Sequence, residues 1–141
     1  MEGRFMVAVG AVIEHEPSGE VLLLKRAQKA GFAPGVWEDI TGRMKQLEEP
    51  EQALRREVRE ETGLEISIVK PLRVFHIFRG ARTPGNELVG ILFWCKTQGK
   101  EVKLSEEHTE FRWLKPDEAL HLLDSDGIKE DIVAYIKECG K

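Results

Sequence analysis

Cysteine is scarce in this 141-residue chain, which contains only Cys95 and Cys139. The two lie far apart, form no C-x-x-C pair and have no histidine cluster beside them, which argues against a zinc site or a redox dithiol. Long apolar runs are also missing, since Gly10 and Glu14 interrupt the stretch that starts at Phe5. The sequence therefore predicts no signal peptide and no membrane partner, and a cytoplasmic location is the expectation.

An excess of basic residues is absent as well. The chain has 21 Lys and Arg residues against 25 Asp and Glu residues, for a net charge of -4. Nucleic acid is therefore not expected as a partner, because domains that bind it gain much of their affinity by neutralising phosphates. A small anionic substrate, in contrast, needs only a few cations and a metal. With 41% hydrophobic residues, the chain is long enough for one core, and residues 1–141 are expected to form a single domain.

The spacing of apolar residues and turn signals predicts an alternation of strands and helices. Strands are expected at residues 5–13, 21–24, 36–40, 66–78, 88–97 and 111–114. Helices are expected at residues 50–62, 116–123 and 128–138. Pro50 suits the first turn of the first helix, and Gly63 suits its end. This order indicates an α/β fold with a mixed sheet, the central helix on one side and the C-terminal helix on the other.

The helix expected at residues 50–62 carries acidic residues on its apolar side. At about 100° per residue, Glu57, Glu60 and Glu61 share the arc of the apolar stripe around Val58. One interpretation is a solvated surface helix whose acids pair with arginines one turn away. The other is a partly buried acidic cluster, which requires a compensating cation. Mg²⁺ or Mn²⁺ suits such a cluster, because both ions prefer hard oxygen ligands.

The spacing around this helix favours the second interpretation. From Gly42 to Leu64 the chain resembles the signature of the Nudix hydrolases at every defining position. That signature is Gly, five residues, Glu, seven residues, Arg-Glu, an aliphatic residue, any residue, Glu-Glu, any residue, Gly and an aliphatic residue. The resemblance implies an α/β/α sandwich with a loop-helix-loop catalytic motif. It also implies hydrolysis of a phosphoanhydride bond in a nucleoside diphosphate linked to another moiety.

The same resemblance gives the motif residues their expected roles. Glu57, Glu60 and Glu61 would bind one or more Mg²⁺ or Mn²⁺ ions, with the carbonyl group of Gly42 as a further ligand. The remaining charged positions of the motif look like supports that orient these carboxylates. They are Glu48 and Arg56.

The general base stays open between two residues. Glu57 is the first candidate, because it lies within the helix and would polarise the attacking water. The segment from Glu107 to Leu114, with His108 second and Trp113 near its end, resembles a segment of MutT-like members. That likeness makes Glu107 a candidate for a fourth metal ligand or for the base, whereas an acidic surface loop is the simpler alternative.

Three residues outside the motif are candidates for contacting the substrate. Arg26 ends a predicted strand where Nudix proteins often carry an arginine that contacts phosphate. Trp37 and Phe78 could stack on a base, although core packing is an alternative for both. Before the helix, Lys45 and Leu47 replace the Glu and Gly of the commonest members, so a stiffer and less acidic loop is expected.

The leading functional hypothesis is a Mg²⁺-dependent, MutT-like pyrophosphohydrolase that acts on a nucleoside triphosphate and releases pyrophosphate. A second enzymatic hypothesis is hydrolysis of an ADP-sugar or a dinucleoside polyphosphate. The alternative of a different class is a non-catalytic module for nucleotide sensing or interaction, which the complete set of motif acids disfavours. A homodimer is a further expectation, because dimers are common in the family.

Overall fold

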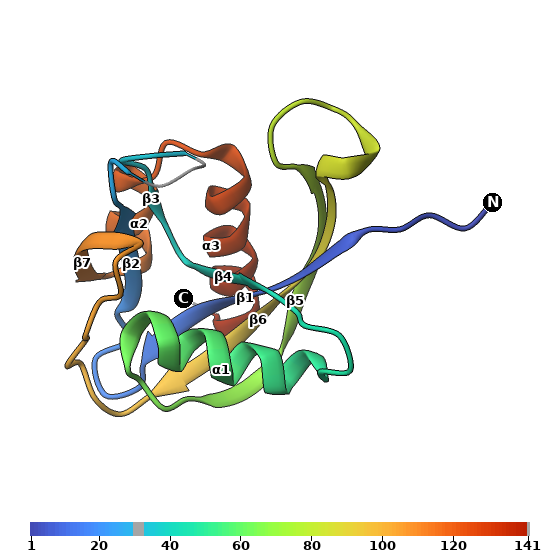
Figure 1. Ribbon diagram of the computed structural model, residues 1–141. Coiled ribbons are helices and arrows are strands. Elements are labelled where there is room, and N and C mark those ends of the chain that lie inside the picture. Colours follow the sequence, from blue (N-terminus) through green and yellow to red (C-terminus); the bar gives the residue numbers. More distant parts are fainter. Residues whose placement is uncertain (30–32, 141) are drawn as a thin grey trace.

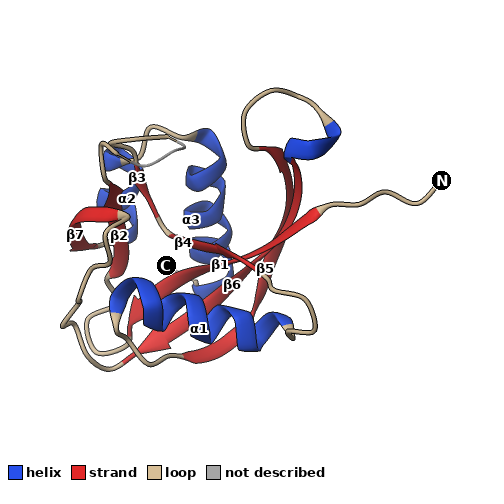
Figure 2. Cartoon of the chain, in the orientation of Figure 1, coloured by secondary structure: helices blue, strands red, loops and turns tan. Residues whose placement is uncertain are grey.

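The computed structural model describes residues 1–29 and 33–140. In this part of the chain the elements follow one another as β1 (Met6–His15), β2 (Val21–Arg26), β3 (Trp37–Glu38), β4 (Ile40–Arg43), α1 (Pro50–Thr62), β5 (Ser67–Phe78), the 3₁₀ turn η1 (Pro84–Asn86), β6 (Glu87–Thr97), β7 (His108–Leu114), α2 (Pro116–Leu122) and α3 (Asp126–Cys139). Figure 1 shows their arrangement, and Figure 2 distinguishes the helices from the strands.

The strands form a mixed seven-stranded sheet in the order β3-β2-β1-β6-β5, in which β4 also pairs with β1 and β7 also pairs with β2. The central pair, β1 and β6, is parallel, with a register that runs from Met6 opposite Leu88 to His15 opposite Thr97. The other pairs are antiparallel. The expected mixed sheet is therefore confirmed.

Alternate residues of β1 point to two different cores, one on each face of the sheet. Ile13 belongs to a buried cluster that includes Leu54 and Val58 of α1. Val12 belongs to a second cluster that includes Ile132 of α3. The helices α1 and α3 thus cover opposite faces, which confirms the expected α/β/α sandwich (Figure 1).

The helix α1 has the ends that the sequence predicts. Pro50 opens its first turn, and Gly63 follows its last residue with a left-handed backbone, at φ 74°. The other predicted elements are also present, with ends that shift by a few residues. The largest shift is in β7, which begins at His108 because its pairing with β2 continues past a bulge to Arg26.

One predicted strand is divided in two. Within residues 36–40, β3 pairs with β2 and β4 pairs with β1. Asp39 lies between them, at the point where the chain leaves one neighbour for the other. The short loop that contains this residue therefore lies beside the start of the catalytic motif.

Two loops connect neighbouring strands. Residues 79–86 connect β5 to β6 and include the η1 turn. Residues 28–35 contain two glycines and a proline, which favours a loop. Within them, residues 30–32 lie outside the described part of the chain, and the described remainder contains neither helix nor strand. Among the described helices, none combines the length and the apolar character needed to span a bilayer.

Candidate active site

The strand β4 and the helix α1 meet at a glycine. A Cβ atom added to Gly42 would lie 2.1 Å from Cδ of Glu57, closer than two non-bonded atoms approach. Glycine therefore allows the backbone of β4 to contact the side chain that projects from the middle of α1. This contact places the carbonyl-bearing backbone of Gly42 directly beside the Glu57 carboxyl group.

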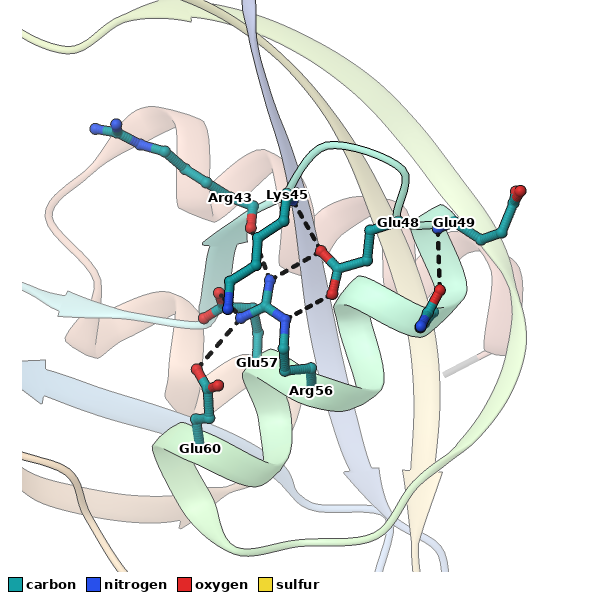
Figure 3. A network of polar contacts seen from close by, with 8 residues as sticks. Arg43, Lys45, Glu48, Glu49, Arg56, Glu57 and Glu60 are labelled. Carbon is teal, nitrogen blue, oxygen red and sulfur yellow. Dashed lines mark hydrogen bonds and ion pairs between the residues drawn. The ribbon is translucent and has the colours of Figure 1, made fainter.

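A single arginine ties the loop before α1 to the helix and to β4. Arg56 Nε donates to Glu48 Oε2 at 2.6 Å, and its Nη2 donates to Glu48 Oε1 at 3.0 Å and to the carbonyl oxygen of Arg43 at 3.0 Å (Figure 3). Its Nη1 donates to Glu57 Oε1 at 2.7 Å. The hydrogen bonds from Arg56, followed by the backbone N–H of Lys45, lower the pKa of Glu48 to about 2. The bidentate pair fixes the orientation of Glu57.

Glu60, another acid of the motif, points away from the cavity lined by Glu57. Glu60 has a side chain that is 57% exposed, and its Oε2 accepts from Arg56 Nη1 at 3.3 Å (Figure 3). Glu60 is not among the residues that line the cavity described below. Within residues 1–29 and 33–140, no three His, Cys, Asp or Glu side chains stand together as a finished cation cage.

Glu61 is the most unusual group on α1. It is 6% exposed, and its Oε2 is buried without a hydrogen-bond partner among the described residues. Burial, followed by the charges of Glu57 and Glu107, raises the pKa of Glu61 to about 9. Burial also raises the pKa of Glu57. Such crowded and desolvated carboxyl groups require either a proton or a cation, so this donor set fits a divalent ion.

These acids help to line a cavity of about 790 Å³. Glu57, Glu61 and Glu107 all line it, together with Gly42. The opposite charge is present as well, since four arginines line the same cavity: Arg26, Arg43, Arg73 and Arg79. Of these, Arg73 is paired with Glu130 and Asp131. Burial, followed by the charges of Arg43 and Arg26, lowers the pKa of Arg79. A cavity lined by both acidic and basic side chains suits a metal and a polyphosphate.

The structure brings some of the expected substrate residues to the cavity and leaves others outside it. Arg26 lines the cavity, and its Nη1 donates to Glu38 Oε2 at 3.1 Å. Phe78 lines it too. Trp37 does not. It packs against the core below α3, and the guanidinium of Arg112 lies 5.0 Å from its ring centroid.

The lining includes residues that the sequence reading missed. Arg43 directly follows Gly42, the first residue of the motif, and this position beside the expected metal site was a signal in the sequence. Arg79 had only its place at the end of a predicted strand as a signal. Glu38 had none, although its Oε2 accepts from Arg26 and from Nε2 of His108, at 2.8 Å. Lys45, which replaces a Glu of the commonest family members, is absent from this lining and lines instead a second hollow beside Phe5.

A family model described as the NUDIX domain matches residues 4–136. The nucleoside triphosphatase NudI of Escherichia coli strain K12 is 31% identical to this chain over 111 residues, which cover 73% of this chain and 78% of the relative.

Solved structures agree with this fold. The MutT protein from Methanosarcina mazei Go1 superposes with a TM-score of 0.81 and 24% identity, over 100% of this chain and 99% of the other. An Ap4A hydrolase from C. elegans superposes with a TM-score of 0.77 and 21% identity, over 96% and 98%. At such identities the likeness concerns the fold alone. With the family model matching nearly the whole chain and a nucleoside triphosphatase among its relatives, the chain belongs to the NUDIX domain family and is a Nudix hydrolase.

Proposed function

We propose that this protein is a nucleoside triphosphate pyrophosphohydrolase that depends on Mg²⁺ or Mn²⁺ and releases a nucleoside monophosphate and pyrophosphate. One observation carries the proposal: the buried Glu61 carboxyl group, with an unpartnered oxygen, lines the same cavity as further acids and the arginines Arg26, Arg43 and Arg79. A metal held by the acids and phosphates held by the arginines would satisfy both sets of charges. The name of the NudI relative, a nucleoside triphosphatase, supports the same substrate class.

The metal would be held by Glu57 and Glu61, with the carbonyl oxygen of Gly42 as a neutral ligand. Glu60 would join after turning away from Arg56, and Glu107 approaches from the loop before β7. A bound divalent ion neutralises phosphate oxygens and lowers the pKa of water at such a site. Mg²⁺ commonly keeps several waters and binds through one or two carboxylates plus substrate phosphates, so an incomplete cage of side chains suits it.

The arginines have a separate task. Arg26, Arg43 and Arg79 would hold the phosphate chain of the substrate and fix it for in-line attack at phosphorus. Glu38 accepts from Arg26 and keeps that guanidinium at the cavity wall. In this arrangement the arginines bind and orient the substrate, and the acids of α1 act at the bond that breaks.

The proton of the attacking water needs an acceptor. Glu57 is our first candidate, because it lines the cavity and Arg56 fixes its carboxyl group. Glu107 is the second, since it lines the same cavity from another element. A Glu107→Gln variant separates the two: loss of only a few-fold in kcat removes Glu107 from the role of base, because general bases contribute roughly 10²- to 10⁴-fold.

The test is a screen of pyrophosphate and phosphate release over nucleoside triphosphates, ADP-sugars and dinucleoside polyphosphates, with Mg²⁺, with Mn²⁺ and with EDTA. We expect metal-dependent release of pyrophosphate from a triphosphate, and its loss in Glu57→Gln and Glu61→Gln. Turnover of an ADP-sugar or a dinucleoside polyphosphate, and of no triphosphate, would support the metal-dependent hydrolysis but contradict the proposed substrate.

The matched control is Glu51→Gln, which removes an exposed carboxyl group from the same helix. Its activity should equal that of the wild type. Turnover that persists in EDTA or in Glu61→Gln would overturn the mechanism. Nucleotide binding in calorimetry without hydrolysis of any compound would instead indicate a sensing module.

A further inference from the structure

The cavity also contains a buried pair of carboxyl groups that have no part in the catalytic motif. Asp39 lies between β3 and β4 and is 2% exposed, and Asp131 lies on α3 and is 6% exposed. Both line the cavity. They are far apart along the chain, and the proposed hydrolysis gives neither of them a role.

The two carboxyl groups share a hydrogen bond and therefore a proton. Burial, followed by the charge of Asp131, raises the pKa of Asp39 well above its ordinary value, and burial also raises the pKa of Asp131, so the pair holds a proton between its two carboxyl groups. Asp131 also accepts from Arg73, whose Nη1 lies 2.5 Å from Asp131 Oδ1. The second guanidinium nitrogen of Arg73 donates to Glu130 at 2.8 Å. The pair is thus held from the side of α3 by an anchored arginine.

One oxygen of the Asp39 carboxyl group is left as an unused acceptor. Among the described residues, no N–H or O–H group donates to Asp39 Oδ2, although this atom is buried. Buried polar atoms are nearly always satisfied, so an oxygen left without a donor in a cavity wall indicates a donor on a ligand. The acceptor capacity of Asp131, in contrast, is already used by Arg73 and by Asp39.

We propose that Asp39 is a specificity-determining residue, and that its carboxyl group accepts a hydrogen bond from an amino group on the heterocycle of the bound nucleotide. The inference rests on the proposed function, because it takes the ligand to be a nucleotide whose phosphates lie between the arginines and the acids of α1. Asp39 would read the ring while those groups act on the phosphates.

The neighbouring lining suits the face of a ring. Phe75 and Ile128 line the same cavity as Asp39. Phe75 packs against β6 where Gly90 leaves room, since a Cβ there would be 2.1 Å from Phe75 Cζ. Arg73 lies 5.8 Å from the Phe75 ring centroid, so the aromatic ring and the anchored carboxyl pair are close together. Apolar walls with a few fixed polar groups are typical of sites that bind a heterocycle.

Heterocycles with an exocyclic amino group fit this acceptor. Adenine, cytosine and guanine offer such a donor. Uracil and thymine instead offer one ring N–H between two carbonyl oxygens. At the carboxyl pair these carbonyl oxygens would meet an acceptor and find no donor. A buried acceptor left unpaired by the wrong ligand gives strong discrimination, because the site then loses its hydrogen bond without regaining water.

The test compares triphosphates with and without the amino group: ATP against purine riboside triphosphate, GTP against ITP, and CTP against UTP. In the last pair a carbonyl group replaces the amino group and the neighbouring ring nitrogen gains a hydrogen. Steady-state kinetics give kcat/KM for each triphosphate, and calorimetry gives Kd for each corresponding monophosphate. We expect at least one pair to differ by roughly 10-fold or more in favour of the amino compound. Asp39→Leu should bring that ratio below about 3-fold. Asp39→Asn should keep it, because an amide donates to Asp131 and still offers a carbonyl acceptor.

The control is Tyr135→Phe, which removes another buried hydrogen bond of α3, from Tyr135 Oη to Glu14 Oε1 at 2.6 Å, outside the cavity lining. It should lower stability and leave the substrate ratios unchanged. Hydrolysis without any preference in the wild type would overturn the inference while leaving the proposed function intact, even where the Leu variant does not fold. A binding preference for the amino compounds without hydrolysis would support the inference about Asp39 and overturn the proposed function. An unchanged ratio in a folded Asp39→Leu variant would leave the pair as a structural link only and overturn the inference.

Discussion

Replacing Glu61 by Gln should make the metal-free protein more stable at alkaline pH. In the folded state the pKa of Glu61 is raised from 4.5 to about 9, with burial as the main cause. A raised pKa of an acid means that the folded state binds the extra proton. The contribution of Glu61 to the free energy of unfolding is therefore fully present below pH 4.5 and is lost as the pH rises toward about 9. Glutamine has no such proton to bind.

The size of the effect follows from the same shift. One pKa unit corresponds to about 1.36 kcal/mol, so the linkage term of Glu61 changes by about 4 kcal/mol between pH 5 and pH 8. The difference in the free energy of unfolding between Glu61→Gln and wild type should grow by that amount over this range. The cost of burying an amide in place of a carboxyl group does not depend on pH, so it cancels when the difference in the free energy of unfolding is compared between pH values.

The assay is urea unfolding in EDTA at pH 5, 6.5 and 8, followed by tryptophan fluorescence. Glu51→Gln serves as the control for the loss of one charge, because that carboxyl group is exposed on the same helix. A gap between Glu61→Gln and wild type that stays constant with pH, or that narrows toward pH 8, would refute the view that Glu61 is held in a desolvated site. Added Mg²⁺ should stabilise the wild type and not the variant.

Three further predictions concern neighbouring residues. Gly42→Ala should abolish most activity and lower the free energy of unfolding by about 1 to 3 kcal/mol, because its Cβ would overlap Glu57; activity assays and urea unfolding measure both effects, and wild-type turnover would contradict the close contact. Arg56→Lys keeps the charge but loses the bidentate pair with Glu48, so kcat should fall by about 10-fold or more while circular dichroism stays unchanged; full activity would show that charge alone suffices. Arg79→Met should raise KM for a triphosphate by roughly 10-fold with a smaller effect on kcat, as measured by steady-state kinetics at constant ionic strength. A large fall in kcat with an unchanged KM would show instead that the arginine acts only in the transition state.

Local features explain why much of the fold could be predicted. The helix α1 begins at Pro50 and ends before Gly63 because these residues favour such positions in almost any context. The apolar residues at 5–13 predicted a strand, and the structure shows that β1 contributes to a core on each face of the sheet. The division of residues 36–40 into β3 and β4 could not be predicted, because it depends on two different neighbours in the sheet.

Within the site, helix periodicity was informative but incomplete. It placed Glu57, Glu60 and Glu61 on one arc, yet Glu60 remains exposed and pairs with Arg56 whereas Glu61 is buried. The difference depends on what packs beside each side chain. Trp37 is a similar case, since its type suited both stacking and packing, and the cluster around α3 holds it away from the cavity.

The sequence alone determined the family resemblance, the boundaries of α1 and the carboxylate chemistry of the motif, because spacing and backbone preference act over a few neighbouring residues. Only the tertiary structure placed Arg43 and Arg79 in one cavity with Glu61, and Asp39 against Asp131. Those groups are distant along the chain, and no local pattern records their meeting. Sheet pairing and the docking of α3 bring them together, and the burial that results is what raises the pKa values of Glu61 and Asp39.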